Sequence, residues 1–153
     1  MAFCETGKRW TMTLVRDGDS DPAHVEILFF TDVTIDENGV ITGGVVRVAD
    51  VGGPLMSQLR GRCKTTELAG LPLVSRMNFI FRAKKGATER GIHMSGIAYN
   101  RTATVLFDPS FSGTWRTFTP DANTPPSAGA GELQSLVLAA DPGETGTGNG
   151  NQT

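Results

Sequence analysis

The sequence predicts an all-β fold: a single antiparallel up-and-down β-barrel of about eight strands, with a short C-terminal helix or strand and a flexible tail. Apolar and polar residues alternate in short runs, turn residues separate these runs, and a glycine recurs inside several of them. The glycine-containing phrases are Ile41–Val45, Met94–Ala98 and Phe111–Trp115, with a looser copy at Leu59–Cys63. Because glycine weakens an ordinary strand, its repetition indicates tight bends or close backbone approach, as in a small closed barrel.

Eight runs within the first 119 residues have the alternation and composition of strands. They are Lys8–Arg16, His24–Ile35, Val40–Val48, Arg60–Leu68, Leu73–Lys84, Gly91–Asn100, Thr102–Asp108 and Phe111–Thr119. The Asn-Gly pair in Asp36–Gly39 tolerates positive φ and should close a hairpin between the second and third runs. In the fifth run, Met77, Phe79 and Phe81 share one face, which should turn toward the core.

The composition changes after Thr119, and we divide the chain there into four parts. The predicted parts are a barrel domain at 1–119, a Pro/Gly/Ala linker at 120–131, a short docking segment at 132–141 and a disordered Gly/Thr/Asn tail at 142–153. Leu133, Leu136 and Val137 have helical spacing, although a strand at 135–139 fits nearly as well. The tail carries too little apolar surface to fold, unless an assembly holds it.

Length and composition set limits on the class of protein. At 153 residues the chain is long enough for one domain with a hydrophobic core, and its 19 Gly and 8 Pro favour turns over long helices. No apolar run approaches the roughly 20 residues that span a membrane. The first ten residues lack the apolar stretch of a secretory signal. We therefore expect a cytoplasmic protein without a membrane-spanning segment.

The two cysteines, Cys4 and Cys63, lie far apart and do not have the spacing of a metal site. In a cytoplasmic protein, two reduced thiols are the first expectation. The alternative is a single disulfide, which would require an oxidising compartment.

Two segments resemble the avidin and streptavidin family, within the wider lipocalin-like barrels. Val33–Gly43 looks like the second hairpin of that family, and His93–Gly96 looks like its sixth strand. Trp10 on the first predicted strand adds to the likeness, which covers roughly residues 8–119. The resemblance implies the same barrel fold.

The residues that hold biotin in that family do not carry over. Val45 stands where the family pattern has a Tyr, and Met94 and Phe81 stand where it has Trp. Without those groups, the polar head of biotin would find few hydrogen-bond partners when buried, and unpaired buried polar groups are costly. The resemblance therefore does not imply biotin binding.

Charge is unevenly distributed along the chain. Residues 1–50 carry a net charge of −5, residues 51–118 carry +7 and residues 119–153 carry −4. Alternate basic residues in the middle section should project from one face of two neighbouring strands. This predicted basic patch consists of Arg60, Arg62, Lys64, Arg76, Arg82 and Lys84.

Three interpretations of the basic patch stay open. It is a solubilising face that protects the sheet from aggregation, a site for an acidic protein surface or another anionic partner, or a contact for the chain's own acidic tail. Nucleic acid is disfavoured, because base stacking needs aromatic side chains among the charges and the aromatics here should face inward.

The barrel interior is a second candidate site. Small barrels either fill with side chains or hold one small ligand. The residues that would line such a ligand site are Trp10, Phe79, Phe81, Tyr99 and Trp115. Core packing is the competing interpretation for all five.

The sequence offers little for catalysis, and we predict no catalytic residue, cofactor or metal ligand. His24 and His93 are isolated within predicted strands, and no Ser-His-Asp set or paired carboxylates stand out. Asp17–Asp21 has the composition of a calcium loop but lacks its length and terminal Glu, so an acidic turn is expected.

These observations favour a non-catalytic β-barrel that binds a small, mainly apolar ligand. The alternative is a structural or interaction protein that uses the basic patch to bind an acidic partner. This second hypothesis predicts partner capture or self-association that weakens with salt.

Overall fold

The computed structural model describes residues 4–49, 55–66, 74–85, 88–100, 109–125 and 144–152. They hold nine strands: β1 (Trp10–Arg16), β2 (Glu26–Ile35), β3 (Val40–Val48), β4 (Leu55–Gln58), β5 (Arg60–Thr66), β6 (Val74–Lys85), β7 (Thr88–Asn100), β8 (Pro109–Phe118) and β9 (Thr145–Gln152). A 3-10 helix, Pro22–His24, precedes β2. Among the described residues, no helix has the length and apolar character needed to cross a membrane.

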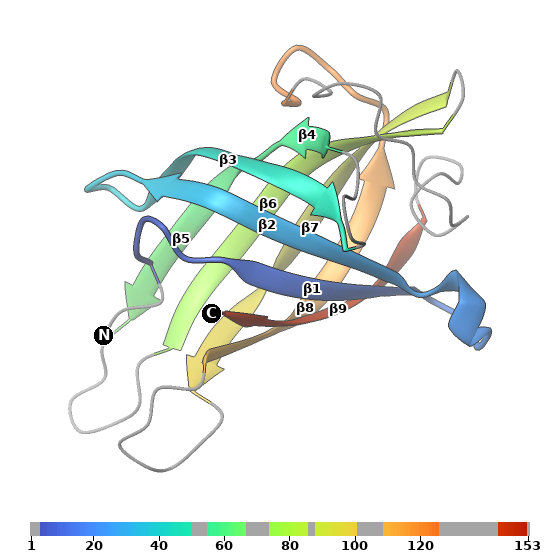
Figure 1. The fold of residues 1–153 in the computed structure, drawn as a ribbon, viewed down its shortest axis with the longest axis horizontal. Helices are drawn as coiled ribbons and strands as arrows, with labels where there is room; N and C mark the ends of the chain where they lie inside the picture. The colour runs from blue at the N-terminus through green and yellow to red at the C-terminus, as the bar shows by residue number, and fades with distance from the viewer. Residues whose placement is uncertain are drawn as a thin grey trace.

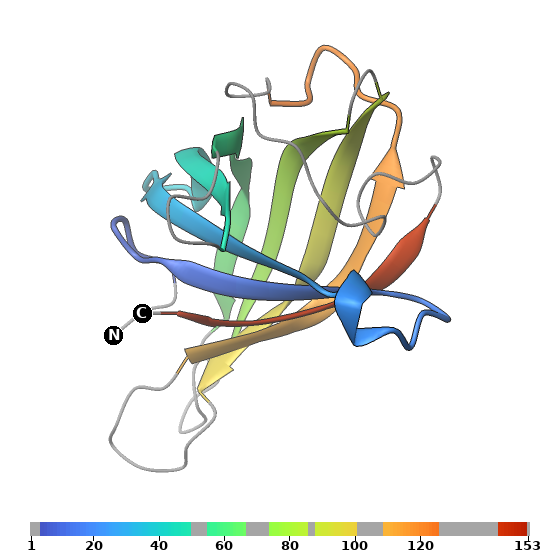
Figure 2. The same cartoon turned by 45° about the vertical axis from the view of Figure 1, so that its right-hand side comes forward.

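Eight of these strands form a closed antiparallel barrel, which confirms the predicted fold class (Figure 1). Around the ring they are β1, β2, β3, β5, β6, β7, β8 and β9, and β9 pairs again with β1. The short β4 is not part of this ring. It pairs with β3 at Val45–Arg47, whereas β5 pairs with β3 at Val40 and Ile41. Figure 2 shows the strands curling round a common interior. Neighbours in the ring follow one another along the chain, as in the predicted up-and-down meander.

The predicted hairpin between the second and third strands is confirmed. The Asp36 carboxylate accepts hydrogen bonds from the backbone N–H groups of Asn38 and Val40, at 2.8 and 2.9 Å. Gly39 has a φ of +78°, a conformation that a side chain would disfavour. A Cβ at this position would also overlap the carbonyl oxygen of Cys63. The turn therefore needs glycine for both its conformation and its packing.

Aromatic and aliphatic side chains fill the interior of the barrel. Phe30 contacts Phe79 with ring centroids 5.0 Å apart, Phe79 contacts Phe111 at 5.7 Å, and Phe111 contacts Trp10 at 6.5 Å. Met77, Phe79 and Phe81 are buried, as their shared strand face predicts. The other fully buried apolar side chains of this core are Met12, Leu14, Leu28, Val33, Ile41, Val46, Leu59, Ile92, Met94, Ala98 and Trp115.

The prediction that Tyr99 faces the interior is wrong. Met94 and Ala98 on β7 are buried inside the barrel, so the alternation of the strand turns Ile97 and Tyr99 outward. Tyr99 is half-buried and lines a hollow on the outer surface beside Thr11. The predicted interior set therefore reduces to Trp10, Phe79, Phe81 and Trp115.

The predicted disordered tail is instead a strand of the barrel. β9 lies between β1 and β8 and pairs with seven residues of each (Figure 1). The barrel is therefore not contained in residues 1–119, because it closes through residues 145–152. The strand predicted at 102–108, the docking segment at 132–141 and the second half of the linker lie outside the described residues.

β9 is a polar strand, and glycine on its inward face explains how it fits into the barrel. Exposed and buried residues alternate along β9, and Gly146, Gly148 and Gly150 are the inward positions. A Cβ on Gly148 would lie 2.7 Å from the Cε of Met94, and one on Gly150 would overlap the sulfur of Met12. The larger residues of the neighbouring strands fill the space above the glycines, so β9 contributes hydrogen bonds rather than apolar surface.

Cys4 and Cys63 form a disulfide, which overturns the expectation of two reduced thiols. The segment before β1 runs along the end of β2, where the backbone N–H of Gly7 donates to the carbonyl oxygen of Val33 at 2.9 Å. This path carries Cys4 to the inward-facing Cys63 on β5, with Cα atoms 5.6 Å apart. The disulfide thus ties the N-terminal segment to a strand 59 residues away.

Candidate partner-binding face

Three cations gather on the outer surface of β5 and β6. Antiparallel register places Lys64 opposite Arg76 and Arg62 opposite Asn78. Arg76 in turn lies opposite Ile97 on β7, whose side chain is 44% exposed. These five residues line an open hollow of about 460 Å³, and we call them the basic face.

The cations of the basic face have no acidic partner among the described residues. Among the described residues, ion pairs join Lys8 to Glu5, Arg82 to Glu89, Arg16 to Asp19 and Glu144, and His24 to Asp19 and Asp21. Like charges directly opposite each other on antiparallel strands are destabilising. The Lys64–Arg76 pair therefore costs the sheet stability, and folding alone does not account for it.

Protection against aggregation accounts for only part of this face. Lys64 lies where β5 extends beyond the two residues of β3 that pair with it, and a lysine at such an edge blocks unwanted pairing. Arg76 lies on β6, which pairs with a strand on each side. An edge-protecting function therefore fits Lys64 but not Arg76.

The structure separates the other residues of the predicted patch from the basic face. Arg60 donates to the carbonyl oxygen of Leu59 at 2.7 Å and to the side chain of Gln58 at 3.1 Å. Arg82 makes hydrogen bonds to a loop beyond β8 and an ion pair with Glu89. Arg82 is thus held by tertiary contacts, whereas the hydrogen bonds of Arg60 are local to its own stretch of chain. The side chain of Lys84 lies outside the described part of the chain.

The interior candidates are core residues: the Trp10 ring contacts Phe111, the rings of Phe79 and Phe81 contact Phe30, and Trp115 lies against Gly146 of β9. Trp10, Phe79 and Phe81 have at most 1% of their surface exposed, and so has Trp115. The Trp115 indole N–H donates to the carbonyl oxygens of Val15 and Thr147, at 3.2 and 3.1 Å. Its polar atom is thus satisfied by the protein itself.

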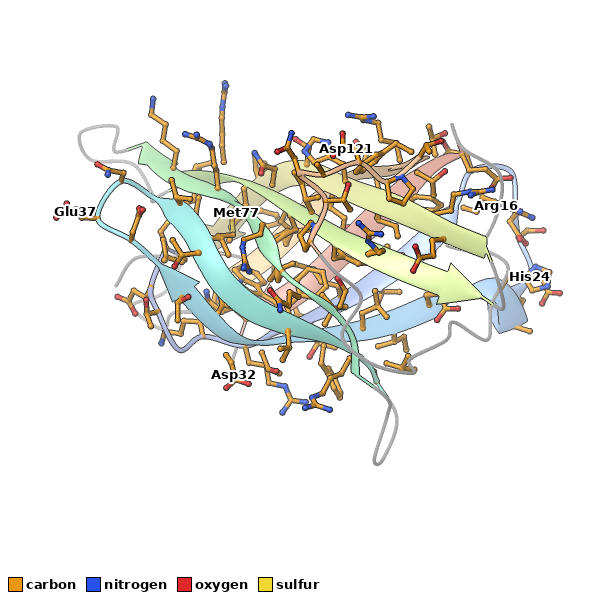
Figure 3. All side chains as sticks on the ribbon, turned by 90° about the horizontal axis from the view of Figure 1, so that it is seen from above. Arg16, His24, Asp32, Glu37, Met77 and Asp121 are labelled. Carbon is orange, nitrogen blue, oxygen red and sulfur yellow. A yellow bond between two sulfur atoms is a disulfide. The ribbon has the colours of Figure 1, made fainter. Side chains whose placement is uncertain are left out.

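The acidic turn at Asp17–Asp21 satisfies its own carboxylates. Asp19 accepts hydrogen bonds from the Asp21 backbone N–H at 3.0 Å and from Arg16 at 3.2 Å, and lies 2.8 Å from the His24 ring. The Asp21 hydrogen bond, followed by that with His24, lowers the pKa of the Asp19 carboxyl below 3.8. Figure 3 shows Arg16 and His24 together at the end of the barrel opposite Glu37. Within the described chain, no group of acids, His or Cys is arranged to hold a metal ion.

Sequence reasoning missed a further candidate site on the outer surface, which we call the second outer hollow to distinguish it from the hollow of the basic face. Across β6, β7 and β8, Ile80 lies opposite His93 and His93 lies opposite Arg116. With Phe118 and the loop beyond β8, they line a space of about 290 Å³. Burial, and then the nearby charge of Arg116, lower the pKa of His93 below 6.5. Both effects favour the neutral imidazole over the charged one. The alternation of β7 predicts that His93 faces outward. The sequence of the loop that covers His93 does not predict that the loop packs there.

The His93 pKa provides a test of this arrangement. We expect Arg116→Gln to raise this pKa part of the way toward 6.5, because the charge is lost while the burial remains. An NMR titration of the imidazole, assigned with His93→Asn, measures it, and an unchanged pKa would contradict the contact. Because the folded protein holds this proton more weakly than the unfolded chain, stability should decrease as the pH falls below about 6.5.

Comparison with known proteins finds no match to this chain among family models, curated proteins or solved structures. The eight-stranded antiparallel barrel is consistent with the avidin-like or lipocalin-like architecture that the sequence resemblance implies.

Proposed function

We propose that this protein is a non-catalytic interaction barrel that binds an acidic protein surface through the basic face. The observation that carries the proposal is that Arg62, Lys64 and Arg76 converge on one open hollow without an acidic partner in the described chain. An acidic partner would relieve the repulsion between the opposed Lys64 and Arg76. Binding would thus be favoured by electrostatic complementarity.

The neighbours of the cations favour a protein partner. Ile97 on β7 lies opposite Arg76 and is 44% exposed. Val74 lies two residues before Arg76 on the same face of β6 and is 37% exposed. Arginine is enriched in protein interfaces, and the buried cores of these interfaces are apolar. Among the described residues, no aromatic side chain lines the hollow itself, and Tyr99 faces outward beside it, opposite Val74. A base would therefore lack the series of rings on which single-stranded nucleic acid stacks.

A small apolar ligand inside the barrel has less support. The rings of Trp10, Phe79 and Phe81 are buried against other core side chains, and the glycines of β9 are covered by Trp115, Met94 and Met12. A ligand would have to displace this packing. We therefore favour the outer surface over the interior as the binding site.

We further propose that the chain works in an oxidising compartment. The expectation of a cytoplasmic protein implied two reduced thiols, whereas Cys4 and Cys63 form a disulfide. Structural disulfides are rare where thiols are kept reduced and persist in secreted or periplasmic surroundings. A partner would then be met outside the cytoplasm.

Binding of an acidic model peptide tests the proposed function. We expect a fluorescent peptide of alternating Glu and Leu to bind with a Kd below about 1 mM at low salt, and at least about ten-fold more weakly at high salt. The combined Arg62→Glu, Lys64→Glu and Arg76→Glu changes should abolish binding, measured by fluorescence anisotropy. Arg82 is left unchanged because its hydrogen bonds support the fold, and Arg60 because it does not line the hollow.

The control has the same net charge on another part of the barrel. It combines Lys8→Glu, Arg9→Glu and Arg47→Glu. Lys8 and Arg9 lie just before β1, and Arg47 lies on β3. This control should retain peptide binding. Equal loss in both variants, or equal binding of a peptide with Gln in place of Glu, would overturn the proposal.

A further inference from the structure

The second outer hollow has an apolar floor with one cation beside it. Ile80 and Phe118 supply the apolar surface, and Arg116 lies over the Phe118 ring with its guanidinium carbon 5.7 Å from the ring centroid. Gly91 lies opposite Phe118 in the sheet, and a Cβ there would overlap the phenyl ring. The glycine thus lets Phe118 lie against the sheet and form the base of the hollow.

A loop held by Arg82 forms the roof. Arg82 donates to the carbonyl oxygens of Thr124 and Pro125, at 3.3 and 3.0 Å, and both residues are buried. The Asp121 carboxylate accepts from the backbone N–H of Asn123 at 2.8 Å, which closes the turn. Asp121 lies on the outer side of the barrel (Figure 3). These bonds hold the loop against β6 and β8 and make the hollow a preformed space.

The polar groups around this space differ in what they can bind. Arg116 has a ring contact but no acidic partner among the described residues. His93 is half-buried and can donate or accept one hydrogen bond as a neutral ring. The Asp121 carboxylate accepts both of its turn hydrogen bonds, from the Asn123 N–H and the Thr124 hydroxyl, through Oδ1. An anionic group beside Arg116 would therefore gain a charge-assisted hydrogen bond.

We propose that the hollow formed by Ile80, His93, Arg116 and Phe118 under the Asp121–Pro125 loop binds a small organic acid with an apolar body. The carboxylate lies at Arg116, and the apolar body lies on Ile80 and Phe118. A volume of about 290 Å³ is near the lower limit of ligand pockets and suits a molecule of one ring. This site is independent of the basic face, and either proposal can fail without the other.

Amide NMR titration with phenylacetate tests the proposal. We expect saturable shifts at Ile80, His93, Arg116, Phe118 and the loop, with a Kd of about 1 mM or below. Phenethyl alcohol and phenethylamine, which keep the ring but lack the negative charge, should bind at least about ten-fold more weakly. Absence of saturable shifts with phenylacetate would overturn the proposal.

Two variants separate the hollow from general attraction of an anion. Arg116→Gln should weaken phenylacetate binding at least about ten-fold, whereas Arg47→Gln, the same charge change on β3, should leave it unchanged. Ile80→Trp fills the floor while keeping Arg116, and should also abolish binding. Equal effects of the two arginine changes, or retained binding in Ile80→Trp, would place the anion elsewhere and overturn the proposal.

Discussion

Removal of the Cys4–Cys63 disulfide is expected to lower the free energy of unfolding by about 4 kcal/mol. The disulfide joins residues 59 apart, so it closes a long loop in the unfolded chain and restricts the conformations available there. Domains of this size are stable by only about 5–15 kcal/mol, so the loss is a large fraction of the total. Urea unfolding of the Cys4→Ala, Cys63→Ala variant, followed by tryptophan fluorescence, measures it.

Two controls accompany the disulfide prediction. The oxidised protein, unfolded without reductant, should not react with iodoacetamide, while the reduced protein should take up one label at each of Cys4 and Cys63. Reduced wild-type protein should unfold at nearly the same urea concentration as the double-alanine variant. Labelling of the unreduced, unfolded chain, or equal stability with and without reductant, would contradict the prediction.

The disulfide marks one limit of what the sequence predicts. The strands and the hairpin at Asp36–Gly39 follow from local signals, namely alternation with period two and an Asn-Gly turn. The pairing of Cys4 with Cys63 has no such signal, because it depends on the curvature that brings the N-terminal segment beside β5. Local patterns thus predict strands better than contacts between distant strands.

The candidate sites show the same difference. Alternate spacing along β5 predicts that Arg62 and Lys64 project together, and register then brings Arg76 opposite Lys64. The partners of Arg82 at Thr124 and Pro125 are more than 40 residues away and come from a segment that resembles a linker. The spacing of residues along the sequence therefore predicts neither the hydrogen bonds of Arg82 nor the hollow that the loop bound by Arg82 covers.

The most informative failure is β9, because composition alone suggests disorder there. Low apolar content normally means too little buried surface to offset the entropy of folding. Here the apolar surface above the strand is supplied by Met12 and Trp115 of the adjacent strands β1 and β8 and by Met94 of β7, and only glycine leaves room for these side chains. Alternation of glycine with Thr or Asn is the signal that could have predicted a strand.

This explanation predicts that an inward glycine of β9 is far less tolerant of substitution than its outward neighbour. In Gly146→Val, the new side chain would overlap the Val15 carbonyl oxygen and the Trp115 indole. The first is backbone of the paired strand β1, which cannot move without breaking the ladder. We expect the free energy of unfolding to fall by about 3 kcal/mol or more, measured by urea unfolding.

Thr147→Val is the matched control, because it introduces the same side chain one residue away on the exposed face. Valine suits a strand, so this change should alter stability by less than about 0.5 kcal/mol. Its backbone carbonyl, which accepts from the Trp115 indole, is retained. A disordered segment would tolerate valine equally at both positions. Equal stability of Gly146→Val and Thr147→Val would therefore show that residues 145–152 do not close the barrel, whereas a large difference between them follows only if the glycine face is packed against Trp115.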